Sequence, residues 1–143
     1  MLKGLRLLLV EDTPISAVVV GEILRGAGAS LDLAVDGLQA IEAVRRVAYS
    51  LVVMDCQLPR IDGYEATRRI RALEAAWALQ GPRLTARGDH ADPLAGRLPI
   101  LALTACSTPA DHERARLAGM DALIAKPVDA RRLLSAIGRH TSR

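Results

Sequence analysis

Five short apolar segments recur along this chain, and each is followed by a stretch in which apolar residues return every three or four positions. This pattern predicts strands that alternate with helices. Neighbouring parallel strands need a crossover, whereas antiparallel neighbours need only a turn, so the alternation favours a parallel sheet with helices on both faces. The expected strands span residues 5–10, 30–35, 51–54, 99–105 and 122–125.

Capping signals indicate where the expected helices begin. Thr13 and Thr108 each precede a proline, which suits the first turn of a helix. Asp36 and Asp62 are each followed three residues later by Gln or Glu, as in a capping box. The expected helices span residues 14–25, 37–47, 64–79, 109–119 and a stretch from 129 onward. We therefore predict an α/β fold, a flavodoxin-like (βα)5 doubly wound parallel sheet of order 2-1-3-4-5, in a single domain over residues 1–143.

Composition limits the classes of partner. The 143 residues are 50% hydrophobic, enough for one core. Aromatic residues make up only 2% and the net charge of +3 comes from scattered arginines, so we expect no direct contact with nucleic acid. The apolar run near the start is too short for a signal or a span, which predicts no membrane contact. Two cysteines without metal-site spacing suit a reducing cytoplasm.

Polar side chains follow four of the expected strands. Glu11 and Asp12 come after the first strand, Asp55 after the third, Thr104 after the fourth and Lys126 after the fifth. Because the carboxyl ends of parallel strands meet at one edge of a sheet, we expect these side chains to form one pocket.

The pocket chemistry predicted from these residues is phosphoryl transfer. Three carboxylates close together repel unless a cation holds them, and ligands that are all oxygen favour Mg²⁺, with Mn²⁺ as a substitute. Asp55 can then act as a nucleophile and form an aspartyl phosphate, while Lys126 and Thr104 contact the phosphoryl oxygens.

The motifs around these residues resemble the receiver domain of two-component response regulators, most closely the receivers of hybrid sensor histidine kinases. The matching segments are LLLVEDTPIS, LVVMDCQLPRIDGYEATRRIRALE, PILALTA and DALIAKPVD. The resemblance implies that Asp55 accepts phosphate from a phosphohistidine and that Glu11, Asp12, Asp55 and the backbone carbonyl of Gln57 hold Mg²⁺. It implies catalytic contacts from Thr104 and Lys126 and a cis peptide before Pro127.

The same resemblance implies the partners and the fate of the phosphate. The donor would be a sensor histidine kinase or a histidine phosphotransfer protein, and the phosphate would be hydrolysed or passed on in a phosphorelay. The chain would be a signalling domain that catalyses its own phosphorylation and dephosphorylation, a monomer or a weak phosphorylation-dependent dimer. Were it part of a hybrid kinase, the parent would be a histidine kinase.

Alternative interpretations remain at this stage. A phosphorylation-independent receiver-like scaffold would usually have lost acidic residues or the lysine, and all five are present. A haloacid-dehalogenase-like phosphatase would carry a second Asp where Gln57 stands. Taken singly, Asp12 or Asp55 could be a cap or turn residue, and Cys56 and Cys106 could form a redox switch.

Three features depart from the family pattern. Residues 75–97 form a longer connection than usual, rich in Gly, Pro and Arg, which we interpret as an extended loop insertion at the edge opposite the phosphoryl site. Leu123 stands at a switch position where receivers carry Tyr or Phe, so we expect Thr104 and the loop after it to transmit a weaker or different output change. Thr13 and Ser16 replace Asn residues, and we expect both still to cap the first helix.

Overall fold

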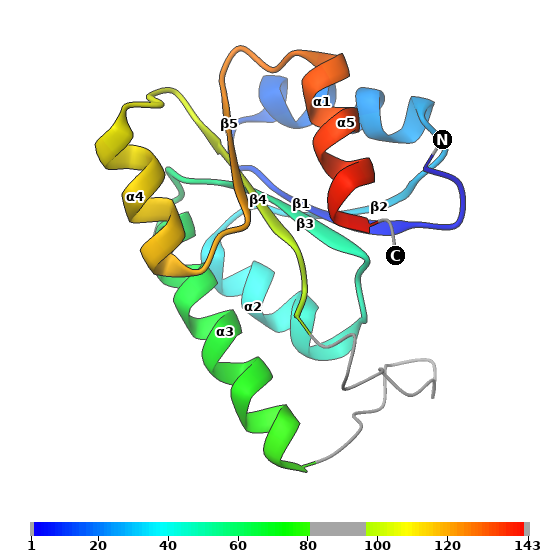
Figure 1. Ribbon diagram of the computed structural model, residues 1–143. Helices are drawn as coiled ribbons and strands as arrows, with labels where there is room; N and C mark the ends of the chain where they lie inside the picture. Colours follow the sequence, from blue (N-terminus) through cyan, green and yellow to red (C-terminus); the bar gives the residue numbers. More distant parts are fainter. Residues whose placement is uncertain (1, 81–96, 142–143) are drawn as a thin grey trace.

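The computed structural model describes residues 2–80 and 97–141, and there it contains five strands and five helices in strict alternation. Each strand is followed by a helix (Figure 1), as the sequence pattern predicts. The elements are β1 (Arg6–Val10), α1 (Pro14–Gly26), β2 (Ser30–Ala34), α2 (Gly37–Arg46), β3 (Leu51–Asp55), α3 (Gly63–Gln80), β4 (Ile100–Thr104), α4 (Pro109–Ala118), β5 (Ala122–Ala125) and α5 (Ala130–Thr141).

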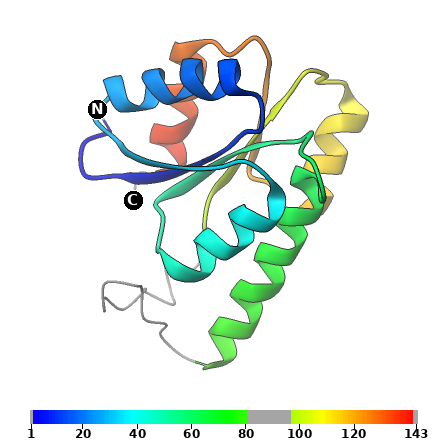
Figure 2. The same ribbon diagram turned by 180° about the vertical axis from the view of Figure 1, so that it is seen from behind.

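The strands form one parallel sheet in the order β2-β1-β3-β4-β5, which confirms the predicted order. Helices α1 and α5 cover one face, and α2, α3 and α4 cover the other (Figures 1 and 2). The fold is therefore the doubly wound, flavodoxin-like arrangement. Among the described helices, none combines the length and the apolar character needed to cross a bilayer.

The two faces of the sheet have separate aliphatic cores. Alternate residues of each inner strand point to opposite faces, so Val52 and Met54 pack toward α2 and α3, while Leu51 and Val53 pack toward α1 and α5. All residues of β3 and β4 are buried, as expected for strands covered on both sides. β2, by contrast, is a half-exposed edge strand, in agreement with its alternating sequence.

The structure confirms three predicted side-chain caps and corrects those of Thr13 and Ser16, the second of which lies inside α1 and not at its cap position. Asp36 accepts a hydrogen bond from the Gln39 amide at 2.7 Å, Asp62 accepts one from the Glu65 amide at 2.8 Å, and Thr108 forms a complete capping box with Asp111. Thr13 occupies the N-cap position of α1, but its side chain makes no capping bond. Its backbone N–H instead donates to Glu11 Oε1 at 3.2 Å, because Glu11 lies within reach of the helix entrance.

Part of the expected insertion is helical. α3 continues to Gln80, so residues 75–80 extend the helix and do not belong to a loop. Residues 81–96 lie outside the described part of the chain. The end of α3 and the start of β4, which flank them, lie at the edge of the sheet opposite the carboxyl ends of the strands (Figure 1), as predicted.

A network of hydrogen bonds and ion pairs around Arg71 joins the second half of α3 to the chain just before β4. The guanidinium donates to Glu74 Oε1 at 2.8 Å, to the Leu98 carbonyl at 2.7 Å, and to Asp121 Oδ2 at 2.9 Å. Glu74 in turn accepts from the Leu98 amide, and Asp121 accepts from the Ile100 amide. The Arg71 side chain is only 14% exposed, so these charged groups depend on one another for neutralisation.

We expect Arg71→Met to lower the free energy of unfolding by about 2–3 kcal/mol, because it leaves Glu74 in a half-buried network without its cation and leaves Asp121 with only the more exposed Arg97. Urea denaturation monitored by circular dichroism measures this loss. The matched control is Arg69→Met, since Arg69 pairs with Glu65 on a surface where its side chain is 50% exposed. A change of less than about 0.5 kcal/mol is expected there, and equal losses in both variants would contradict the network's role.

Candidate functional site

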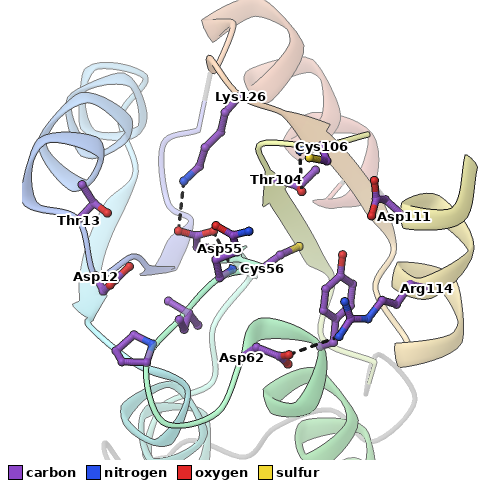
Figure 3. Close-up of a pocket in the computed structure, with 14 residues that line it drawn as sticks. Asp12, Thr13, Asp55, Cys56, Asp62, Thr104, Cys106, Asp111, Arg114 and Lys126 are labelled. Atoms are coloured by element: carbon purple, nitrogen blue, oxygen red, sulfur yellow. Dashed lines mark hydrogen bonds and ion pairs between the residues drawn. The ribbon is translucent and has the colours of Figure 1, made fainter. Parts of the chain in front are cut away.

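The predicted site residues converge on one open pocket at the carboxyl edge of the sheet (Figure 3). The pocket has a volume of about 720 Å³, and Asp12, Asp55, Gln57, Thr104 and Lys126 all contribute to its wall. They come from the ends of four strands and from the loops that follow. Glu11 is 1% exposed and does not line the pocket, but it accepts a hydrogen bond from Lys126, which does.

Lys126 neutralises two buried carboxylates. Its Nζ donates to Asp55 Oδ2 at 3.1 Å and to Glu11 Oε2 at 3.2 Å. Asp55 is 4% exposed and Glu11 is 1% exposed, so neither could remain charged there at low cost without a cation. The backbone supports this geometry, because the Lys126 amide donates to the Thr104 carbonyl at 2.7 Å and the bond to Pro127 is cis, as predicted.

The pKa values follow from this crowding. Burial raises the pKa of Glu11, and the neighbouring Asp55 carboxylate raises it further, against the opposing effects of the Thr13 amide and Lys126. Burial lowers the pKa of Lys126, but Asp55 and Glu11 together outweigh it, so the net shift is upward. Lys126 is therefore a cation throughout the physiological range, held by a cluster that carries excess negative charge.

That excess suits a divalent cation. Glu11, Asp12 and Asp55 each offer a carboxylate oxygen, and these oxygens lie within 4.8 Å of one another. One ammonium offsets only part of the three negative charges. Hard oxygen ligands and an open side toward solvent fit Mg²⁺, which binds through a few carboxylates and retains several waters. The residues therefore fit the metal that the sequence predicts.

Local backbone geometry places the remaining groups around Asp55. Gly63 opens α3 so close to the strand end that a Cβ there would overlap the Asp55 carbonyl, and the Gly63 amide donates to the Cys56 carbonyl at 3.0 Å. The Gln57 amide donates to Asp55 Oδ1 at 3.0 Å, which orients the carboxylate. Thr104 lines the pocket with its hydroxyl oxygen accepting from the Cys106 amide at 3.2 Å.

Some residues that line the pocket are not indicated by the strand-end pattern. One predicted residue lies outside the pocket wall. Tyr64 and Arg114 line the pocket from α3 and α4. They follow the strand ends by nine or more positions, and only the packing of two helices brings them there. Leu123, by contrast, does not line the pocket and packs, half-buried, against the core between the sheet and α2–α4.

Comparison with known proteins decides the family. The sequence matches the response regulator receiver domain over residues 7–138. The chain belongs to the response regulator receiver family. It is thus a receiver module of two-component signalling, and its strand order is that of the receiver fold.

Relatives and solved structures are similar along most of this receiver domain. It is 36% identical to probable histidine kinase 2 of Oryza sativa subsp. indica over 95% of the chain, and 35% identical to hybrid signal transduction histidine kinase B of Dictyostelium discoideum over 86%. The chain spans only 13% and 6% of those proteins.

Two receiver structures resemble it closely. The first belongs to a sensor histidine kinase of Pseudomonas aeruginosa and has a magnesium ion coordinated in its active-site cleft (36% identity, TM-score 0.77, covering 98% of this chain and 99% of that one). The second belongs to a Saccharomyces cerevisiae response regulator, crystallised with a histidine phosphotransfer protein (30% identity, TM-score 0.80, covering 96% and 88%).

The two cysteines beside the pocket differ in environment. Cys56 is 3% exposed, whereas Cys106 is exposed on the loop after β4. Burial raises the pKa of the Cys56 thiol, and the charges of Asp55 and Asp62 add to the shift, while a hydrogen bond with Tyr64 and the charge of Arg114 oppose it. Cys56 is therefore a protonated core thiol, which argues against its role in a redox switch.

We expect iodoacetamide at pH 8 to alkylate Cys106 at least about tenfold faster than Cys56, because alkylation needs an accessible thiolate. Peptide mapping by mass spectrometry after timed quenching measures both rates. The protein unfolded in urea serves as a control, in which both cysteines should react. Comparable alkylation rates for Cys56 and Cys106 in the folded protein would show that the Cys56 thiol is accessible to solvent.

Proposed function

We propose that this receiver domain accepts a phosphoryl group on Asp55 from a phosphohistidine. The observation that carries the proposal is the contact of Lys126 with Asp55 inside a cluster of three carboxylates. The Asp55 carboxylate lies between the Lys126 ammonium and oxygens that can bind a metal ion. Both cations would neutralise charge on an anionic donor, so the carboxylate can attack it. Glu11 shares both contacts, but it is 1% exposed and does not line the pocket, whereas Asp55 does.

The residues would act in an in-line displacement. An Asp55 carboxylate oxygen attacks phosphorus and forms the P–O bond, the P–N bond of the phosphohistidine breaks, and the released imidazole takes up a proton. Lys126 would move from Asp55 Oδ2 to a phosphoryl oxygen, and the Thr104 hydroxyl would donate to another. Glu11, Asp12, Asp55 and the Gln57 carbonyl would hold Mg²⁺, or Mn²⁺ in its place, which neutralises charge on the transferring oxygens.

The same groups support the reverse half of the cycle. In hydrolysis, water attacks phosphorus and Asp55 leaves as the carboxylate, so the domain would promote both its phosphorylation and its dephosphorylation. In a relay, a second imidazole would take the place of water. A cytoplasmic location and a monomeric or weakly dimeric state belong to this proposal, and two free cysteines agree with a reducing compartment.

The protein donor would be a histidine phosphotransfer protein or the histidine kinase itself, and the yeast receiver named above was crystallised with a protein of the first kind. An apolar stripe on α1 supports such docking. Ile15, Val18 and Val19 are 77%, 58% and 49% exposed and share one face of the helix that begins beside the pocket residues Asp12 and Thr13. Exposed apolar groups at the rim of a site commonly mark a protein contact.

We expect the domain, incubated with Mg²⁺ and phosphoramidate, to gain one phosphate by intact mass, and Asp55→Asn to gain none. The amide is nearly the same size as the carboxylate but is a poor nucleophile. A chelator should abolish labelling of the unsubstituted domain. Asp62→Asn is the matched control, because Asp62 also lines the pocket but caps α3. Labelling that survives Asp55→Asn would refute the assignment.

Docking through α1 predicts that a substitution on this helix slows transfer from a protein donor but not from a small-molecule donor. We expect Ile15→Lys to slow transfer from a phosphorylated histidine phosphotransfer protein at least about tenfold, as for a buried interface residue, while labelling by phosphoramidate is unchanged. Rapid-quench gel assays give both rates. Leu79→Lys is the control, since Leu79 is 90% exposed at the far end of α3. An equal effect of the two substitutions would contradict docking on α1.

A further inference from the structure

An arginine of α4 holds two groups of the phosphoryl pocket at once. The Arg114 guanidinium carbon lies 4.1 Å from the centroid of the Tyr64 ring, which is within cation–π range. Its Nη2 lies 3.5 Å from Asp62 Oδ2, and Figure 3 shows this side chain reaching from α4 toward Asp62 below the site. All three residues line the pocket that contains Asp55.

The ring under Arg114 is itself tied to the phosphoacceptor strand. Tyr64 is 4% exposed, and its hydroxyl interacts with the thiol of Cys56, the residue that directly follows Asp55. Burial, and after it this interaction, raises the pKa of Tyr64 to about 12, so the hydroxyl stays protonated at neutral pH. Backbone contact strengthens the tie, because the preceding Gly63 packs on the Asp55 carbonyl.

Among the described residues, the aromatic side chain of the pocket wall comes from α3 and not from β5. Leu123 has no ring and lies outside the pocket wall. Among the described residues that line the pocket, Tyr64 supplies the aromatic ring, and it does so from α3, on the side of the pocket that faces α4.

We propose that Tyr64 and Arg114 form the link by which occupation of the phosphoryl site changes the position of α4. The inference rests on the proposed phosphorylation of Asp55. The link joins the loop after Asp55 to α4, because Arg114 of α4 contacts both Asp62 and the Tyr64 ring. On the same helix, Leu117 is 70% exposed. Reorientation of the Arg114 guanidinium relative to Asp62 and the ring then shifts α4, whose face is open to a partner.

The charges around Arg114 favour a shift of α4 when the phosphoryl site is occupied. A phosphoryl group adds a charge of about −1.5 to −2 to the pocket at neutral pH. Arg114 holds Asp62 through a single 3.5 Å contact, and its side chain is 58% exposed, so this ion pair is weak and the guanidinium can reorient. Asp62 remains fixed when it does, because its other oxygen caps α3 through the Glu65 amide.

The test is the amide spectrum of the domain with Mg²⁺ and beryllofluoride, an analogue of the phosphoryl group, added in sequence. In the unsubstituted domain we expect shifts both at the site, in Cys56, Gln57 and Cys106, and along α4. In Arg114→Gln and Tyr64→Leu the shifts along α4 should fall at least twofold while the site shifts persist. Arg116→Gln is the matched control, since Arg116 pairs with Glu113 on α4 and does not line the pocket.

The double variant gives a second criterion. Two residues of one link should be non-additive, so the double variant should lose no more of the α4 response than either single variant. A full α4 response in Arg114→Gln, or losses that add, would overturn the link. Because Arg114 is exposed, that variant decides the matter even if Tyr64→Leu does not fold. Absence of site shifts in the unsubstituted domain would instead refute the phosphorylation of Asp55, and with it the link.

Discussion

The ion contacts of Lys126 with Asp55 and Glu11 are the interaction on which the site depends. Three carboxylates whose oxygens lie within 4.8 Å of one another, two of them on buried residues, repel one another unless a cation lies among them. The parallel sheet makes the contact possible, because it brings the ends of β1, β3 and β5 to one edge although Glu11 and Lys126 are 115 residues apart. Lys126 offsets part of the negative charge, and the remainder is what attracts a metal ion and, with it, a phosphoryl donor.

The phosphoryl pocket and the Arg71 network lie at opposite edges of the sheet. The phosphoryl pocket lies at the carboxyl edge, and the Arg71 network joins α3, β4 and the turn before β5 at the amino edge. The chain on either side of residues 81–96 is thus fixed by ionic and backbone hydrogen bonds on the face away from the site. No residue that lines the pocket takes part in that network.

Much of this could be predicted from the sequence, for physical reasons. The alternation of strands and helices follows from the apolar runs, and the convergence of the strand-end side chains follows from parallel topology, which brings strand ends together. These side chains belong to Glu11, Asp12, Asp55, Thr104 and Lys126. The strand order was expected from the flavodoxin-like fold, and the structure supplies it. Tyr64 and Arg114 could not be predicted in this way, because their meeting depends on how α3 and α4 pack. The same limit applies to Thr13: its residue type suits a cap, but its side chain makes no capping bond and its amide donates to Glu11. The length of α3, by contrast, was predictable, because the helix expected to end near residue 79 ends at Gln80.

The central claim is that Lys126 and a metal ion share the charge of one carboxylate cluster in which Asp55 is the phosphoacceptor. The most direct measurement is the Mg²⁺ binding isotherm of Lys126→Met beside that of the unsubstituted domain, with the phosphorylation rate recorded on the same samples. Removing the ammonium frees Asp55 Oδ2 and Glu11 Oε2, so we predict Mg²⁺ binding that is about threefold to tenfold tighter, equivalent to roughly 1 kcal/mol of relieved competition, and phosphorylation that is much slower. Weaker Mg²⁺ binding together with an unchanged phosphorylation rate would contradict the account.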